Sequence, residues 1–195
     1  MRSWNDDPFT KKARKENYEA RSIYKLSEID HRERIFKGVK TVLDLGAAPG
    51  SWTQYCLEKL PPTGRIIAVD LNPINVVHPR VTFLQGSIED LDLNSVVPSG
   101  KVEMVLSDMA PKTSGIHNTD VALSIELATL ALDCCRKFLK PGGTFIVKVF
   151  MGPFFEDYQR EIKSAFGSTR IFRPVSVRKQ SREIYFLAKD FRAPN

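Results

Sequence analysis

Short apolar runs alternate with helix-length segments from residue 41 onward, and this alternation constrains the fold more than any other feature of the sequence. Each run has the length of a buried strand. The runs lie at residues 41–45, 65–70, 81–85, 102–108 and 143–150, and helices are expected over 51–60, 119–139 and 155–166. Strands joined by helices of this length form right-handed crossovers. The pattern therefore predicts an α/β, doubly wound, mainly parallel Rossmann-like sheet, whose ligands would bind at the carboxyl ends of the strands.

Both ends of the chain add to this sheet. Near the C-terminus, residues 169–177 and 182–190 read as strands joined by the polar stretch "RKQS", which predicts an antiparallel hairpin and seven strands in all. Residues 1–37 predict a basic helical arm with one apolar stripe, formed by Ile23, Leu26, Ile29, Ile35 and Phe36. We expect residues 1–195 to form a single domain, with the arm at 1–37 and the α/β core at 38–190.

Composition excludes several classes of protein. With 195 residues, 42% hydrophobic and 27% charged, the chain is an ordinary globular protein and not a disordered one. Cys56, Cys134 and Cys135 show no C-x-x-C spacing, and the three histidines show no metal spacing, so neither a disulfide framework nor a metal site is expected. The first residues contain no apolar signal segment, and no apolar run could span a bilayer, so we expect a cytoplasmic protein without a membrane partner.

The net charge of +6 is placed unevenly. Residues 1–21 carry a net charge of +2 and residues 170–195 carry +5, around a middle of −1. Basic flanks on a neutral core favour a polyanionic partner such as nucleic acid, although solvated surface charge would produce the same pattern.

The segment Gly46–Gly50, "GAAPG", joins the first expected strand to a helix through small, uncharged residues. Such residues let backbone N–H groups approach a ligand, and the helix N-terminus adds partial positive charge. Ser51 and Gln54 are spaced as a capping box. The alternative is a tight turn that binds nothing.

Asp70 ends the next apolar run, twenty residues beyond Gly50, where a carboxylate can accept both hydroxyls of an adenosine ribose. Alternatively, Asp70 caps the turn "DLNP". The loop matches neither G-x-G-x-x-G nor a P-loop, and its proline removes a donor that a pyrophosphate would need. A nucleoside without phosphate fits best, which favours S-adenosylmethionine over NAD.

Lys148 interrupts the apolar run "TFIVKVF", where a two-sided sheet demands burial. Breaks of this kind are typical of functional sites. Burial and nearby cations would favour a neutral amine that can accept a proton. Alternatively, Lys148 marks a strand end and its amine reaches water.

Asp108, Glu183 and Lys25 are the other candidate catalytic residues. Asp108 closes one apolar run, Glu183 opens the last one, and Lys25 lies on the arm. Each alone reads as a solvated charge. Together with Lys148 they can assemble two lysines and two carboxylates around the strand ends, a set able to hold and deprotonate a hydroxyl.

The sequence resembles the FtsJ-type (RrmJ, RlmE) ribosomal-RNA 2′-O-ribose methyltransferases from about Arg21 to Ala188. The motifs that carry the likeness occur in the family's order: "RSIYKLSEI", "VLDLGAAPGSWTQY", "GRIIAVDLNP", "FLQG", "LSDMAPKTSG", "LKPGGTFIVKVF" and "SREIYFLA". With neither a targeting segment nor a long C-terminal extension, the chain fits the compact prokaryotic form of the family.

The resemblance implies a catalytic tetrad of Lys25, Asp108, Lys148 and Glu183. It implies that Lys148 is the general base, that Lys25 and Glu183 position it and the ribose, and that Asp108 serves both tetrad and cofactor.

The resemblance also implies a site for the cofactor S-adenosylmethionine. Gly50 and Trp52 would lie beside its methionine part and Asp70 at its ribose, and Gly46 is a further cofactor-binding residue. The sequence departs from the family in two places. Ser51 replaces a usual glycine, and Ser87 replaces the acidic residue near the adenine, so that either Ser87 or Asp90 would make that contact.

The expected reaction is in-line transfer of a methyl group to a ribose 2′-hydroxyl, and no metal is required. The resemblance favours a uridine of assembled large-subunit ribosomal RNA as the target. Phosphates would be bound by basic residues of both flanks: Lys11, Lys12, Arg14, Lys15, Arg21, Arg173, Arg178, Lys179 and Arg182. We expect a monomer. The alternatives are a transfer-RNA 2′-O-methyltransferase, a non-catalytic RNA-binding ribosome-assembly factor and, least favoured, a nicotinamide-dependent oxidoreductase.

Overall fold

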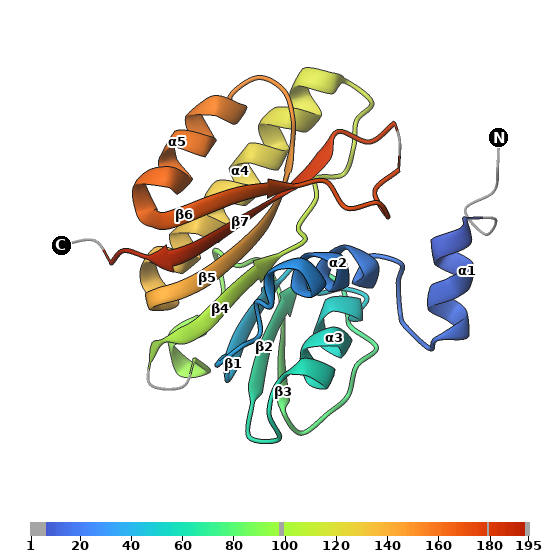
Figure 1. Ribbon diagram of the computed structural model, residues 1–195, viewed down its shortest axis with the longest axis vertical. Coiled ribbons are helices and arrows are strands. Elements are labelled where there is room, and N and C mark those ends of the chain that lie inside the picture. The colour runs from blue at the N-terminus through green and yellow to red at the C-terminus, as the bar shows by residue number, and fades with distance from the viewer. Residues whose placement is uncertain (1–6, 98–99, 179, 194–195) are drawn as a thin grey trace.

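A seven-stranded, mainly parallel sheet forms the centre of the molecule (Figure 1). The computed structural model describes residues 7–97, 100–178 and 180–193. The strands are β1 (Thr41–Leu45), β2 (Arg65–Asp70), β3 (Val81–Gln85), β4 (Val102–Ser107), β5 (Leu139–Phe150), β6 (Phe166–Phe172) and β7 (Glu183–Phe191). Their order is β3-β2-β1-β4-β5-β7-β6, and only β7 runs against its two neighbours, β5 and β6. The doubly wound sheet with an antiparallel C-terminal pair is therefore confirmed.

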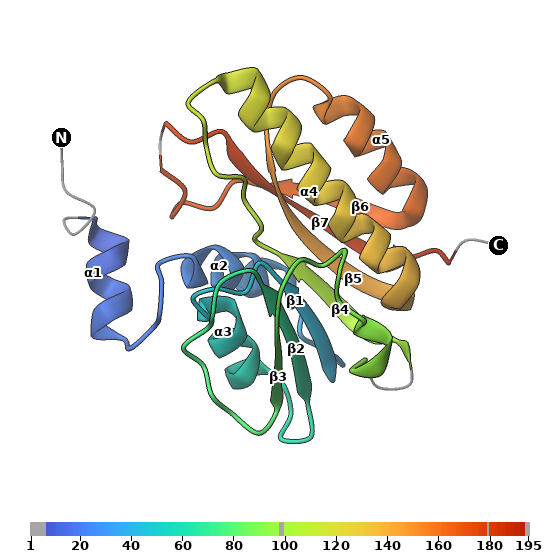
Figure 2. The same cartoon turned by 180° about the vertical axis from the view of Figure 1, so that it is seen from behind.

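Helices cover both faces of this sheet, as the two opposite views show (Figures 1 and 2). They are α1 (Pro8–Lys15), α2 (Ile23–Glu33), α3 (Ser51–Lys59), α4 (His117–Phe138) and α5 (Phe155–Ala165), with a 3₁₀ turn η2 (Leu93–Ser95). Successive strand residues point to opposite faces. In β1, Val42 packs with residues of α2 and α3, whereas Leu43 and Leu45 pack with residues of α4 and α5.

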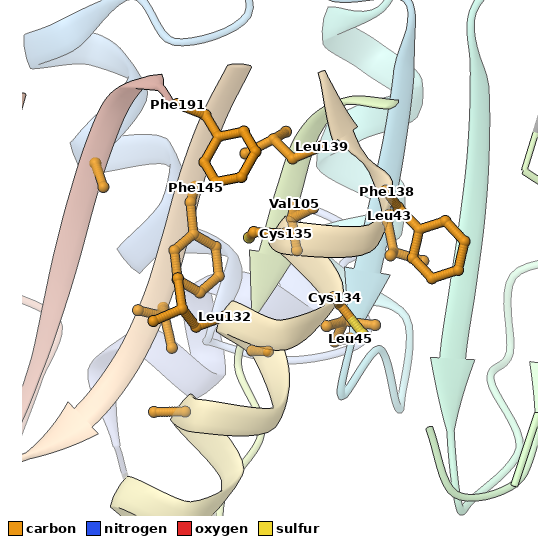
Figure 3. Packing of buried hydrophobic residues seen from close by; sticks show 14 of the residues in the cluster. Leu43, Leu45, Val105, Leu132, Cys134, Cys135, Phe138, Leu139, Phe145 and Phe191 are labelled. Carbon is orange, nitrogen blue, oxygen red and sulfur yellow. The ribbon is translucent and has the colours of Figure 1, made fainter. Parts of the chain in front are cut away.

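The core on the α4 side is a large aromatic and aliphatic cluster (Figure 3). Leu132, Cys135 and Phe138 of α4 belong to it, as does Phe145 of β5. All three cysteines are buried and free, as small core residues. The alternation of apolar runs in the sequence is thus the signature of a sheet that is buried on both faces.

Several predicted boundaries are wrong. The strand predicted over 143–150 begins at Leu139, because Lys140 to Gly143 continue it through an irregularity opposite β4. The helix predicted to close at residue 139 therefore ends at Phe138, and the one predicted at 155–166 ends at Ala165. The strand predicted over 169–177 runs from Phe166 to Phe172 and ends before Pro174, whose nitrogen carries no hydrogen for a ladder bond.

The expected helical arm is two helices with different roles. Ile23, Leu26 and Ile29 of α2 are buried against the α3 face of the sheet, so α2 belongs to the core. Only α1 lies outside this packing, at the margin of the molecule in both views (Figures 1 and 2). In the described part of the chain, no helix has the length and apolar character needed to cross a membrane.

Phe145→Ala should destabilise the fold by about 3–5 kcal/mol, because it leaves a cavity in the α4-side core. Phe145 is 0% exposed, and its ring stacks on that of Phe166 with centroids 5.9 Å apart. Chemical denaturation measures the loss. Ile171→Ala, at a side chain 47% exposed, is the control and should change stability by less than about 1 kcal/mol. Equal effects of both substitutions would contradict this description of the core.

Candidate active site

Four charged residues that lie far apart in the sequence meet at the carboxyl edge of the sheet. Asp108 directly follows β4, and Lys148 lies near the end of β5. Because β7 is antiparallel to β5, its first residue, Glu183, comes to the same edge, opposite Phe150. Lys25, in the first turn of α2, completes the group.

Two ion pairs join these side chains. The Lys148 amine donates to the backbone carbonyl of Asp108 and lies 3.0 Å from Asp108 Oδ1. Lys25 Nζ lies 2.5 Å from Glu183 Oε1. The side chains are 6% to 16% exposed, so both pairs are largely withdrawn from water. The structure thus brings together all four residues proposed as the tetrad.

Tyr185 connects the two ion pairs, and sequence reasoning missed it. Its hydroxyl lies 2.7 Å from Asp108 Oδ1 and 2.5 Å from Glu183 Oε1. Burial, with Asp108 and Glu183 close by, raises the pKa of this hydroxyl well above its usual value, so Tyr185 remains a donor. A signal was present in "SREIYFLA": residues two apart on a strand share a face, which places Tyr185 beside Glu183.

Asp108 is the electrostatic centre of the group. Burial alone would raise the pKa of its carboxyl, but Lys148 and Lys25 outweigh that effect and hold the pKa below its usual value. The Tyr185 hydroxyl and the Lys148 amine also donate to this carboxylate. Asp108 therefore stays ionised despite its burial.

The loop "GAAPG" is held by its own backbone and by Asp70. Gly46 N and Ala47 N donate to the Val69 carbonyl, and Ala48 N donates to Asp70 Oδ2 at 2.9 Å. Asp70 Oδ1 accepts from Asn72 N at 2.8 Å. The turn-capping role considered for Asp70 is thus present.

Two glycines of this loop have no room for a side chain. Gly46 has a φ of +74°, and a Cβ there would lie 2.7 Å from Met109 N. Gly50 has a φ of +121°, and a Cβ there would lie 2.6 Å from Val76 Cγ2. Both values are in the region that favours glycine, so the loop backbone can lie close against what surrounds it.

The predicted capping box is wrong. Gly50 is the N-cap of α3, and no side chain caps the helix. Ser51 Oγ instead lies 2.6 Å from Ser22 Oγ, and Gln54 accepts from Glu19 N. These side chains join α3 to the chain before α2. Because both are engaged in these tertiary hydrogen bonds, neither caps the helix.

Trp52, proposed beside the cofactor, is 2% exposed. Its indole donates to the Ser22 carbonyl at 2.9 Å, and its ring packs against Tyr185 with centroids 5.8 Å apart. Trp52 therefore links the glycine loop to the start of α2 and to the tetrad. Near the expected adenine site, Ser87 Oγ accepts from Glu89 N at 3.3 Å, and the Asp90 side chain is exposed.

Asp44, two residues before Gly46, is a second residue that sequence reasoning missed. It is 0% exposed, Thr53 Oγ1 donates to its Oδ2 at 2.7 Å, and its Oδ1 has no hydrogen-bond partner. Burial, together with Asp108 and Asp70, raises its pKa to about 7 against the opposing bond from Thr53. A charged residue inside the run "TVLDL" was the available signal.

The described basic residues proposed for RNA lie on α1, just before α2 and in the β6–β7 connection. Arg21 pairs with Asp7 of the α1 cap and donates to the Ser176 carbonyl, which joins the arm to the β6–β7 connection. Arg182 lies against His117 at the start of α4, and Arg173 donates to the Ser181 carbonyl at 2.7 Å.

The remaining proposed RNA contacts lie on α1 and in the β6–β7 connection. Lys12 lies over the ring of Tyr24 and is 3.9 Å from Glu16. Lys11, Arg14 and Lys15 lie on the same helix, and Arg178 lies in the β6–β7 connection. Lys179 is outside the described residues. Arg21 is only 15% exposed, so its guanidinium mainly holds the fold together.

A pocket of about 320 Å³ lies at the other end of α2 and contains none of the tetrad residues. Among the described residues, no group of three or more His, Cys, Asp or Glu side chains is arranged to hold a metal ion.

Comparison with known proteins agrees with this geometry. The family described as FtsJ-like methyltransferase matches residues 18–191. This chain belongs to that family. A "Ribosomal RNA large subunit methyltransferase E" of Bdellovibrio bacteriovorus is 43% identical over 185 residues, 93% of this chain and 94% of the relative.

Two solved structures are also similar. A crystal structure of a putative ribosomal RNA methyltransferase from Plasmodium falciparum is 30% identical, with a TM-score of 0.78, covering 91% of this chain and 100% of that one. Human Methyltransferase-like protein 13, solved with SAH, has a TM-score of 0.56 at 14% identity, covering 86% and 79%, and shows likeness of fold. The Rossmann-like methyltransferase fold is therefore confirmed.

Asp44→Asn should change how stability depends on pH. The folded-state pKa of about 7 lies above the ordinary value of 3.8, so between these values the folded protein binds more protons at Asp44 than the unfolded chain does. Asp44 thus makes the free energy of unfolding fall as pH rises from about 4 to 7. The variant should lack this fall, which urea titrations at several pH values measure. Parallel pH profiles for the two proteins would contradict the assignment.

Proposed function

We propose that this FtsJ-like methyltransferase transfers a methyl group from S-adenosylmethionine to a ribose 2′-hydroxyl of RNA. The observation that carries the proposal is the buried tetrad joined through Tyr185. A binding protein has no need of a lysine that is 6% exposed and paired with a carboxylate. The relatives named for large-subunit ribosomal RNA support that RNA as the substrate. Within it, the proposed target is a uridine of the assembled subunit. The corresponding place of action is the cytoplasm.

The residues around the glycine loop fit the cofactor. Gly46 and Gly50 let the loop backbone lie directly against Met109 and Val76, and Asp44 Oδ1 is a buried acceptor without a donor. Each carboxylate oxygen can accept more than one hydrogen bond. Asp70 can therefore bind ribose hydroxyls while it still accepts from Ala48 and Asn72. Ser87 is assigned to the adenine, Trp52 to the wall beside the methionine part, and Asp108 to both cofactor and tetrad.

When bound, S-adenosylmethionine supplies a methyl group activated by its sulfonium, so the protein must align the ribose and remove one proton. Lys148 is assigned as the base. A neutral amine has two N–H groups and one lone pair. The structure gives Lys148 two acceptors, the carbonyl and the carboxylate of Asp108. Once the ammonium of the ion pair has lost one proton to solvent, these acceptors can hold both remaining N–H groups, and the lone pair is available for the hydroxyl proton.

The remaining residues fix geometry. Lys25 and Glu183 are held against each other and can bind the ribose, while Tyr185 fixes the separation of the two carboxylates. Alignment of two reactants can contribute roughly 7–11 kcal/mol, more than the about 10²–10⁴-fold typical of a general base. Positioning by this network is therefore expected to supply most of the rate enhancement.

Lys148→Ala should abolish methyl transfer while cofactor binding persists. Lys148→Arg distinguishes the role of the positive charge from the role of the base. A guanidinium keeps the charge but does not lose its proton, so it cannot act as a base. We expect both variants to fall at least about 10²-fold in turnover. Single-turnover transfer of labelled methyl to RNA measures the rate, and calorimetric titration of S-adenosylmethionine is the control. Near-normal turnover by either variant would remove Lys148 as the base.

Tyr185→Phe should lower turnover while S-adenosylmethionine binding stays near normal, since the ring remains packed on Trp52 while the two carboxylates lose the one hydroxyl that they share. Removing one such bond costs about 1–3 kcal/mol, or roughly 5- to 150-fold. The same single-turnover assay measures the loss. The proposed positioning role fails if the variant is as active as the parent.

The substrate is tested by incubating the protein with labelled S-adenosylmethionine and either large subunits, naked ribosomal RNA or transfer RNA. Mapping of the labelled nucleotide then identifies the base and the methylated oxygen. Label at a 2′-oxygen of large-subunit RNA is expected. Label on transfer RNA alone supports the transfer-RNA alternative, and absence of label on every RNA supports the non-catalytic assembly factor.

A further inference from the structure

Phe154 combines three properties that a structural residue does not need. It is 60% exposed, it immediately precedes α5 as the N-cap, and its backbone is left-handed, with φ 67° and ψ −3°. Bulky side chains rarely adopt this conformation, which Gly and Asn adopt at little cost. The sequence therefore places a large apolar ring where folding alone favours a small residue.

The core does not require this ring. The next residue, Phe155, points inward and stacks on Phe186 with centroids 5.4 Å apart, and Tyr158 packs on the same ring at 6.0 Å. Because Phe155 fills the inner position, Phe154 is left on the outside of the turn. Its side chain adds little to the burial that holds α5 on the sheet.

The turn that carries Phe154 lies on the rim of the candidate active site. Met151 N donates to the carbonyl of Arg182, the residue before Glu183. Gly152 lies close to Val121 and His117 at the start of α4. The loop between β5 and α5 runs beside that end of α4 in both views (Figures 1 and 2). Phe154 thus follows the strand of Lys148 by one short turn.

The surroundings combine apolar and basic groups. Met151 is 45% exposed and Ile116 is 65% exposed. Arg182 lies against the His117 ring, and that ring lies close to Gly152 in the turn that carries Phe154. An exposed ring beside cationic side chains is the combination that binds unpaired nucleotides, because bases stack on the ring and phosphates meet the cations.

We propose that Phe154 is a platform on which an unpaired base of the RNA substrate stacks, next to the ribose that is methylated. The inference rests on the proposed function, since it takes RNA as the substrate. Stacking at this position holds the strand by a base while its neighbouring ribose lies in the tetrad. Phe154 is then a determinant of substrate choice, favouring single-stranded loops over duplex RNA.

Two substitutions distinguish the effect of the aromatic ring from the effect of the left-handed backbone conformation. Phe154→Asn keeps a residue that tolerates the left-handed conformation but removes the ring, and Phe154→Trp keeps an aromatic surface. We expect Phe154→Asn to weaken RNA binding roughly 5- to 150-fold, the loss typical of one stacked base, and to raise the KM for RNA similarly. Phe154→Trp should stay within about threefold of the parent, and S-adenosylmethionine affinity should be unchanged in both.

Binding is measured by fluorescence anisotropy with a labelled RNA hairpin and with copies in which one loop base at a time is abasic. At one position, loss of the base should weaken binding by the parent but not by Phe154→Asn, since both changes remove the same contact. Ile171→Ser, an exposed apolar residue on β6, is the control and should bind like the parent. Thermal melting should show Phe154→Asn at least as stable as the parent.

Equal RNA binding by the parent and Phe154→Asn overturns the inference, as does the absence of any such base position. Normal methylation of naked RNA with loss only on assembled subunits would overturn it as well, and would identify a ribosomal protein as the partner of the ring. If the parent methylates no RNA, the proposed function fails, and the abasic binding series still decides whether the ring stacks on a base.

Discussion

The ion pair between Lys148 and Asp108 is the interaction on which the candidate site depends. Lys148 lies in a strand whose neighbours are buried on both faces of the sheet, and a buried amine of this kind is costly unless it is paired and hydrogen-bonded. Asp108 meets that requirement because β4 ends beside β5, so that its carbonyl and its carboxylate both face the amine. The parallel pairing of two strands thus fixes the chemistry of two side chains.

A second set of contacts connects this edge to the rest of the chain. Trp52 donates to the Ser22 carbonyl and packs on Tyr185, so the glycine loop, the start of α2 and the tetrad share one aromatic contact. Arg21, one residue before Ser22, holds both the α1 cap and the β6–β7 connection. The arm that carries basic side chains is therefore joined directly to the helix that carries Lys25.

Most of the fold could be predicted from the sequence because a parallel sheet buried on both faces leaves continuous apolar runs. Lys148 could be found because it breaks such a run, and Asp108 because it ends one. The alternation of a strand places Tyr185 on the same face as Glu183, but its contact with Asp108 could not be predicted, since only the pairing of β7 with β5 brings its hydroxyl between the two carboxylates. The capping box failed for the same kind of reason: Ser51 and Gln54 contact residues more than twenty positions away, which local spacing does not reveal.

The position of β7 has a consequence for how the protein is made. β6 pairs with β7 alone, and β7 lies between β6 and β5. A nascent chain that has emerged only as far as β6 has no neighbour for that strand, and it lacks Glu183 and Tyr185. The tetrad is therefore completed only after β6 has been made, when β7 pairs with β5, and no N-terminal fragment of the chain that ends before Glu183 contains all four residues.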